Sequence, residues 1–189
     1  TKRLLRYFEI ENRCISYHNK NENYRAQELI DSLLDGNSIA LVSDAGTPCI
    51  SDPGYRVVHL AHLNNIKVVS IPGPSAVVSA LSISGLPTDH FFFEGFLPKK
   101  KGRKTRFEFL NSLHSSVVIY ESPMRIVKTL NDISIYMGED RIIAVCREIT
   151  KKFEETIMGT VAEAISYFSK KTPKGEFVLV IAKEGYKLS

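Results

Sequence analysis

Residues 39–54 read IALVSDAGTPCISDPG, an apolar run that ends in a loop of glycine, proline and aspartate. The run from Ser38 to Ser43 has the length and composition of a buried strand, and apolar residues at helical spacing precede it over residues 23–36. A second helical pattern follows at residues 55–63, and a second strand-like run at residues 67–71. This alternation of strands and helices predicts the α/β class, with a parallel sheet covered by helices.

The loop at residues 44–54 leaves the carboxyl end of a predicted strand, where open α/β sheets place their ligands. Gly46 and Gly54 permit close approach of the backbone, and Asp44 and Asp52 add two carboxylates. The same residue types are also common in turns, and Asp52 is placed to cap the next helix. The loop alone therefore leaves ligand binding and simple turn formation both open.

A second loop, IPGPSA at residues 71–76, leaves the next predicted strand. Ser75 would begin a helix over residues 75–84, where free backbone amides suit a polar ligand, although a plain helix cap explains Ser75 equally well. Two such loops on successive parallel strands would share one edge of the sheet. This coincidence favours a binding site.

The second half of the chain predicts a further α/β domain with a mixed sheet, because two strand patterns follow each other directly near its end. A boundary is expected at residues 86–89, so the two domains are residues 1–87 and 88–189. The predicted strands are residues 90–94, 116–120, 141–146, 155–158 and 176–182, and the predicted helices are residues 105–113, 125–138 and 161–169.

Six cations lie within eight residues at the start of this half, between Phe96 and Phe107. Such a cluster can neutralise phosphates and predicts nucleic-acid binding, although a solvated basic loop is the alternative. The six are Lys99, Lys100, Lys101, Arg103, Lys104 and Arg106. The segment is not a phosphate-binding P-loop, since its glycines are too far apart, and no G-x-G-x-x-G motif supports a dinucleotide site.

Composition sets further bounds on this chain of 189 residues, of which 43% are hydrophobic and 24% charged. These values are typical of a globular protein, and no apolar run is long enough to span a membrane. The three cysteines match no metal-ligand or disulfide spacing and are expected to be mostly buried, reduced thiols in the cytoplasm. The five histidines form no metal-ligand pattern, so no metal is expected.

Three stretches make the sequence recognisable: LVSDAGTPCISDPGY at residues 41–55, IPGPSAVVSALSISGLPTDHFFFEGFLP at residues 71–98, and YESPMR at residues 120–125. With REITK and KGEFVLV further on, they resemble the tetrapyrrole (corrin/porphyrin) methylases over essentially the whole chain. Within that superfamily they resemble the RsmI group, which methylates a cytidine 2′-oxygen of small-subunit ribosomal RNA.

The resemblance implies two α/β domains with S-adenosylmethionine in the cleft between them, in a homodimer. It also implies which residues contact the cofactor: Ser43, Asp44, Ala45, Gly46, Thr47, Ser75, Ala76, Tyr120, Glu121, Arg147, and the backbone from Gly175 to Phe177. Members of the family begin with a strand and a P-T-P-I-G-N-L loop. By that comparison this chain starts after them and lacks the first strands.

The implied reaction is methyl transfer to a ribose 2′-oxygen of small-subunit (16S) RNA, free or in the 30S subunit. A ribose hydroxyl is a weak acid, so its proton must be removed near the transition state. Lys151 and Glu148 are the candidate bases, with Glu121 as the third. Two alternatives remain at this point: a small-molecule tetrapyrrole or precorrin methyltransferase, and a non-catalytic RNA-binding remnant.

Overall fold

A computed structural model describes residues 1–170 and 172–188 of the chain, which form two compact units. Unit 1 ends at Ser75 and unit 2 begins at Ala76. This division falls earlier than the boundary expected near residue 87. The helix α4 (Ala76–Ile83) accounts for the difference, because it packs against the sheet of unit 2.

Unit 2 is built on a five-stranded sheet in the order β1-β2-β5-β3-β4. β1 and β2 are parallel and the other neighbouring pairs are antiparallel, which confirms the predicted mixed sheet. The strands are β1 (Phe91–Phe96), β2 (Ser116–Glu121), β3 (Ile142–Arg147), β4 (Glu155–Thr160) and β5 (Phe177–Ile181). The α/β fold class is thus confirmed.

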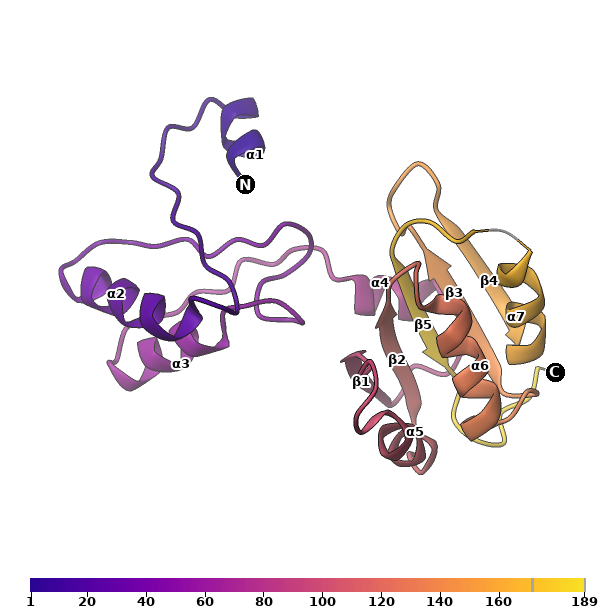
Figure 1. The fold of residues 1–189 in the computed structure, drawn as a ribbon. Coiled ribbons are helices and arrows are strands. Elements are labelled where there is room, and N and C mark those ends of the chain that lie inside the picture. The colour runs from indigo at the N-terminus through magenta and orange to yellow at the C-terminus, as the bar shows by residue number, and fades with distance from the viewer. Residues whose placement is uncertain (171, 189) are drawn as a thin grey trace. The chain divides into compact units, whose positions relative to one another are not determined.

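Helices cover both faces of this sheet (Figure 1). One face packs against α5 (Arg103–Asn111), α6 (Ile126–Met137) and α7 (Val161–Ser169), and the other against α4. Alternate residues of a strand point to opposite faces. The central strands β2 and β5 are therefore apolar and buried along almost their whole length, as the continuous apolar runs of the sequence predict.

The last helix begins with a capping box. The Thr160 hydroxyl accepts a hydrogen bond from the Glu163 amide at 3.2 Å, and the Glu163 carboxylate accepts one from the Thr160 amide at 2.8 Å. The capping box thus satisfies two of the free amides at the start of α7, and those of Val161 and Ala162 donate to the carbonyls of Arg141 and Glu139. The chain therefore passes directly from the edge strand β4 into the helix.

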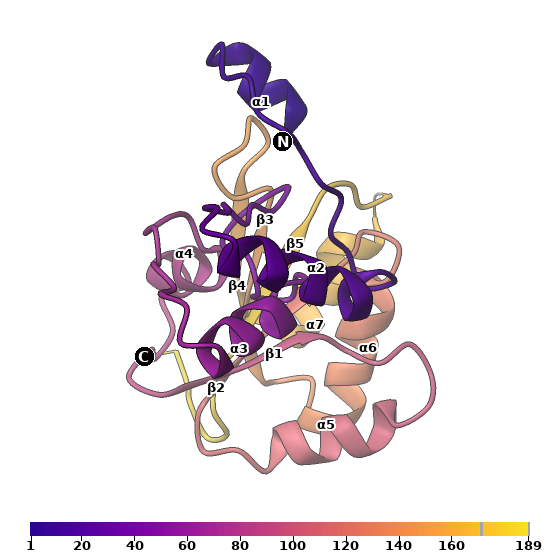
Figure 2. The same ribbon diagram turned by 90° about the vertical axis from the view of Figure 1, so that its left-hand side faces the viewer.

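Unit 1 contains three helices: α1 (Lys2–Tyr7), α2 (Glu22–Leu34) and α3 (Tyr55–Leu63). α2 and α3 lie side by side (Figure 2) and form a small core around Ile30 and Ala61. These two helices occupy the predicted positions. α1 contributes no buried residue.

Two predicted strands of unit 1 are absent from the structure. Residues 38–43 and 67–71 have strand-like composition, but neither belongs to a ladder within the described part of unit 1. Several of their apolar side chains are exposed, including Val42, Val69 and Ile71. A strand requires a hydrogen-bonded neighbour, and these two segments do not pair with each other. The prediction of strands here was wrong for that reason.

The cysteines only partly follow expectation. Cys146 is buried in β3, whereas Cys14 is exposed and Cys49 is intermediate. Within residues 1–170 and 172–188, no helix is both long and apolar enough to cross a membrane. The same residues contain no group of three or more metal-ligating side chains that could hold an ion.

Candidate functional site

In unit 1 the two predicted ligand loops come together. The Thr47 hydroxyl donates a 3.0 Å hydrogen bond to the carbonyl of Pro74, which joins the loop after residue 43 to the loop before α4. Ser43 closes the first turn by donating to the carbonyl of Gly46 at 2.8 Å. Gly46 has a φ of 72°, a backbone conformation that favours glycine. The structure thus brings Ser43–Thr47 and Pro74–Ser75 into one neighbourhood.

The end of the first loop is held by Glu22, a residue that the sequence analysis did not select. Its carboxylate accepts hydrogen bonds from the Gly54 amide at 3.2 Å and from the Tyr17 hydroxyl at 3.3 Å. Burial, followed by the charge of Glu22, raises the pKa of Tyr17 to about 12. Burial also raises the pKa of the Cys49 thiol, so Cys49 is not an activated nucleophile. No pattern in the sequence distinguishes Glu22 from an ordinary acidic residue in the first turn of a helix.

Gly54 is the glycine on which this loop depends most. Its φ is 147°, and a Cβ at this position would lie 2.4 Å from Cys49 Sγ and 2.8 Å from Leu41 Cδ2. Any larger residue would displace both neighbours. Cys49 and Leu41 can therefore lie this close to the start of α3 only because Gly54 has no side chain.

In unit 2 the predicted site residues gather at one edge of the sheet. β1, β2 and β3 run in the same direction, so their carboxyl ends share this edge with the start of β5. The register pairs Phe177 with both Glu121 and Arg147. The loop that contains Lys99–Lys101 leaves the same edge after β1. Phe177 itself is buried and packs against Phe168, so only its backbone is available to a ligand.

The two candidate bases Lys151 and Glu148 form an ion cluster with Glu176. Lys151 Nζ lies 2.9 Å from a carboxylate oxygen of each glutamate. Glu148 also accepts a 2.9 Å hydrogen bond from the amide of Glu176. A Cβ on Gly175 would lie 2.4 Å from Glu148 Cγ, so glycine is required there for the carboxylate to reach this amide. The cluster ties the β3–β4 turn to the segment that leads into β5.

These contacts shift the pKa values of the two candidate bases in opposite directions. Hydrogen bonds to Glu176 and Glu148 raise the pKa of Lys151, so less of the neutral amine is present at neutral pH. The hydrogen bond from Lys151 lowers the pKa of Glu148, which keeps it ionised but makes it a weaker base. Arg147 is also paired, with its Nε 3.1 Å from a Glu155 carboxylate oxygen.

Glu121 lies in a buried polar network rather than at the surface. Its side chain is fully enclosed and accepts hydrogen bonds from the Thr129 hydroxyl at 2.6 Å and the Ser122 amide at 2.8 Å. The Arg125 guanidinium approaches it to 3.4 Å and donates to the carbonyl of Leu97 at 2.8 Å. Glu121 therefore joins β2 and α6 to the loop that follows β1.

Two of the six clustered cations are paired with carboxylates of unit 2. Arg103 is buried and forms a 2.7 Å ion pair with Asp132, and it donates to Thr129 at 2.8 Å. Arg106 pairs with Glu94 and lies over the rings of Phe92 and Phe109. By contrast Lys99, Lys100, Lys101 and Lys104 are exposed. The charge run of the sequence therefore contains four surface lysines and two arginines that pair with carboxylates, of which only Arg103 is buried.

Phe107, which flanks the cluster in sequence, is also a core residue with no exposed surface. Phe96, on the other side, is 55% exposed. The two aromatic residues that the sequence analysis treats alike therefore differ in their availability to a ligand.

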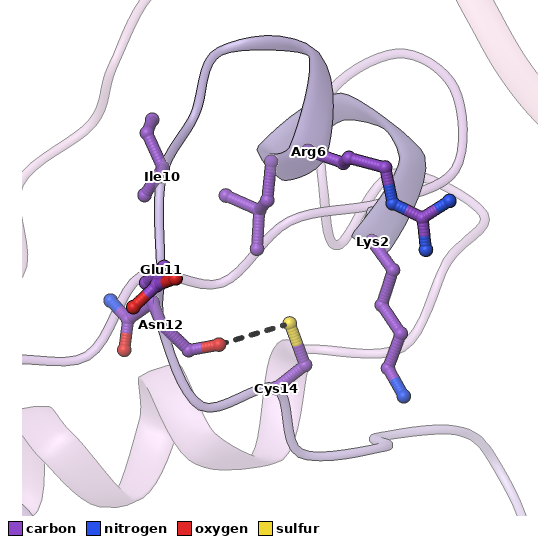
Figure 3. A pocket seen from close by; sticks show the side chains of 7 residues that line it. Lys2, Arg6, Ile10, Glu11, Asn12 and Cys14 are labelled. Carbon is purple, nitrogen blue, oxygen red and sulfur yellow. Dashed lines mark hydrogen bonds between the residues drawn. The ribbon is translucent and has the colours of Figure 1, made fainter.

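A hollow outside these regions is lined by α1 and the segment that follows it (Figure 3). Lys2, Arg6, Glu11 and Cys14 are among its lining residues, and the thiol of Cys14 points toward the carbonyl of Asn12 at 3.9 Å. These side chains are exposed, and no predicted site residue lies among them.

Comparisons with known proteins show the family to which this chain belongs. Residues 3–165 match the family model of the Tetrapyrrole (Corrin/Porphyrin) Methylases, and the chain belongs to that family. It is 45% identical over 189 residues to the ribosomal RNA small subunit methyltransferase I of Halalkalibacterium halodurans, covering 100% of this chain and 65% of that protein. It is 42% identical to the protein of the same name from Thermotoga maritima, covering 95% of this chain and 80% of that protein.

Solved structures of low sequence identity share the fold. A diphthine synthase matches with a TM-score of 0.75 and 13% identity, covering 98% of this chain and 74% of that chain. A uroporphyrin-III C-methyltransferase from Thermus thermophilus, complexed with S-adenyl homocysteine, matches with a TM-score of 0.53 and 15% identity, covering 84% and 74%.

Proposed function

We propose that this chain is part of an S-adenosylmethionine-dependent methyltransferase that modifies a cytidine 2′-oxygen in small-subunit ribosomal RNA. The observation that carries the proposal is the 45% identity, over all 189 residues, to a protein named ribosomal RNA small subunit methyltransferase I. The chain spans 65% of that relative's length, so the proposal concerns the activity of the whole protein. In this proposal the whole protein is a homodimer in the bacterial cytoplasm, and it acts on free RNA or on the 30S subunit.

The donor groups of the first loop fit the proposed cofactor. S-adenosylmethionine supplies a methyl group on a positively charged sulfur, next to an ammonium and a carboxylate. Asp44 is exposed and lies in the turn that Ser43 closes onto the carbonyl of Gly46, and Thr47 joins this turn to the carbonyl of Pro74. Carboxylate and carbonyl oxygens suit the two cationic groups. Ser75 and Ala76, at the start of α4, together with Tyr120, Arg147 and the backbone at Gly175, are proposed as further contacts.

Three residues are candidates for removing the proton of the ribose hydroxyl, and their hydrogen bonds and ion pairs distinguish them. Lys151 is held protonated by its two glutamates, and Glu121 is enclosed by its hydrogen-bond partners. Glu148 is ionised and only half-buried, so we propose it as the group that holds or removes this proton. Lys151 then acts by orienting Glu148.

RNA contact is assigned to the exposed lysines Lys99, Lys100, Lys101 and Lys104. Arg103 and Arg106 support them by holding the segment in place through their ion pairs with Asp132 and Glu94. Each lysine that neutralises a phosphate contributes about one unit to the slope of log affinity against log salt.

The proposal is tested with S-adenosylmethionine labelled in the methyl group and small ribosomal subunits as substrate. Alkali cleaves RNA only next to a free 2′-hydroxyl, so the label is expected in an alkali-resistant dinucleotide that contains cytidine. Label recovered on a base, or in mononucleotides, would contradict ribose methylation. If the Glu148→Gln variant transfers the methyl group at the wild-type rate, Glu148 has no role in the mechanism.

A further inference from the structure

An aromatic ring stands exposed where β1 leaves the sheet. Phe96, the last residue of β1, is 55% exposed. Its ring meets that of Tyr120 edge-to-face at 5.7 Å between centroids, and Tyr120 meets Phe93 in the same way at 5.0 Å. The two half-buried rings support Phe96 from one side and leave its other side to solvent.

A β-bulge sets this orientation. The register of β1 on β2 shifts between Phe93 and Gly95, and Gly95 has a φ of 71°. In a regular strand, Phe96 would point to the opposite face from Phe93, toward α5. The extra residue of the bulge returns Phe96 to the face of Phe93 and Tyr120. The conformation of Gly95 thus holds an apolar ring in solvent instead of burying it under α5.

The surroundings of this ring are cationic. Lys99, Lys100 and Lys101 follow it within five residues and are all exposed. The nearest carboxylate in sequence, Glu94, is paired with Arg106, and Glu121, which follows Tyr120, is paired with Arg125. Within residues 1–170 and 172–188, no carboxylate forms an ion pair with these three lysines. An exposed ring beside such positive charge suits a ligand that combines a flat π-face with phosphate, because bases stack on aromatic side chains while lysines neutralise the backbone.

We propose that Phe96 is a stacking platform for an unpaired nucleobase of the RNA substrate, with Lys99–Lys101 neutralising the adjoining phosphates. This inference rests on the proposed function, since it names how that substrate is held. A purely apolar protein surface would leave three lysines beside the interface without counter-charges, which disfavours such an occupant.

The chain contains no tryptophan, so Phe96→Trp installs a unique fluorescent reporter at the proposed platform. Titration with an unstructured RNA oligonucleotide is expected to quench this tryptophan while affinity stays near wild type. Phe91→Trp is the matched control, because Phe91 is 44% exposed and lies at the other end of the same strand, about 16 Å away at the strand rise. Its fluorescence is expected to change little.

Phe96→Ala should weaken RNA binding by roughly 5- to 100-fold, the range for losing one stacked base. The salt slope should stay unchanged, since no charge is removed, whereas Lys100→Ala should lower the slope by about one. Wild-type affinity for RNA in Phe96→Ala would overturn the inference. So would an unquenched tryptophan at position 96 in a variant that binds RNA. Either result would leave the proposed function standing.

Two further outcomes separate the inference from the function on which it rests. If Phe96→Ala weakens binding of S-adenosylhomocysteine and leaves RNA affinity unchanged, the ring serves the cofactor and the inference is wrong. If the wild-type chain shows no salt-dependent RNA binding at all, the RNA part of the proposed function fails, and the inference fails with it.

Discussion

Replacing Arg103 by alanine tests whether the basic segment is partly built into the interior of unit 2. The Arg103 and Asp132 side chains are only 8% and 16% exposed, and their ion pair measures 2.7 Å. Arg103 also donates to the carbonyl of Pro98 at 3.0 Å. Its removal leaves a largely buried carboxylate whose one remaining ion-pair partner among residues 1–170 and 172–188 is the exposed Lys128, at 3.2 Å.

Removing one member of a buried pair costs about 3–5 kcal/mol. Because Lys128 still contacts Asp132, we expect the lower end, about 3 kcal/mol. For a unit of this size that corresponds to a fall of roughly 10–20 °C in the melting temperature. Urea unfolding followed by circular dichroism measures the change in the free energy of unfolding.

Lys101→Ala is the matched control from the same segment. Lys101 is exposed, so its loss is expected to change stability by no more than about 0.5 kcal/mol. A double-mutant cycle with Asp132→Ala isolates the pair and should show a coupling free energy of about 1 kcal/mol or more. If Arg103→Ala is as stable as wild type and the cycle shows no coupling, Arg103 is a solvated cation and the division of the segment into two roles is refuted.

Three smaller perturbations test the local arguments. Thr160→Ala should lower stability by about 1 kcal/mol through loss of the helix cap, and an unchanged thermal melt would contradict the capping box. Gly54→Ala should destabilise unit 1 by about 2 kcal/mol or more, because its Cβ would lie 2.4 Å from Cys49 Sγ; amide exchange in α2 and α3 reports this, and unaltered protection would refute it. The hydrogen bond from Lys151 lowers the pKa of Glu148 below its ordinary value. The stabilisation from this bond is therefore present above that ordinary value and is lost as pH falls through the lowered one. The stability difference between wild type and Glu148→Gln should therefore shrink from pH 6 to pH 3, and a constant difference would argue against the ion cluster.

The elements of unit 2 could be predicted because their composition and their burial agree. β5 is apolar and buried along its whole length, and β2 is apolar from Val117 to Ile119 and buried at every position except Tyr120. Residues 38–43 and 67–71 have a similar composition but no ladder partner among the described residues. Composition reports how apolar a segment is, whereas strand formation also depends on a neighbour elsewhere in the chain.

The candidate site shows the same limit for charged residues. The sequence indicates six equivalent cations, yet Asp132, the partner of Arg103, lies 29 residues away. No local pattern marks such a pair. The turns of the two proposed ligand loops were easier to predict, because glycine and proline restrict the backbone locally. The structure brings both loops of unit 1 together through Thr47 and Pro74.

The central claim, that the chain binds the methyl-donor cofactor through its first loop, is tested most directly by titrating S-adenosylhomocysteine into the purified chain by calorimetry. We predict one saturable site that is weakened by Asp44→Asn and retained in Asp35→Asn, an exposed aspartate of the same unit. Absence of both binding heat and thermal stabilisation in the folded chain would contradict the assignment.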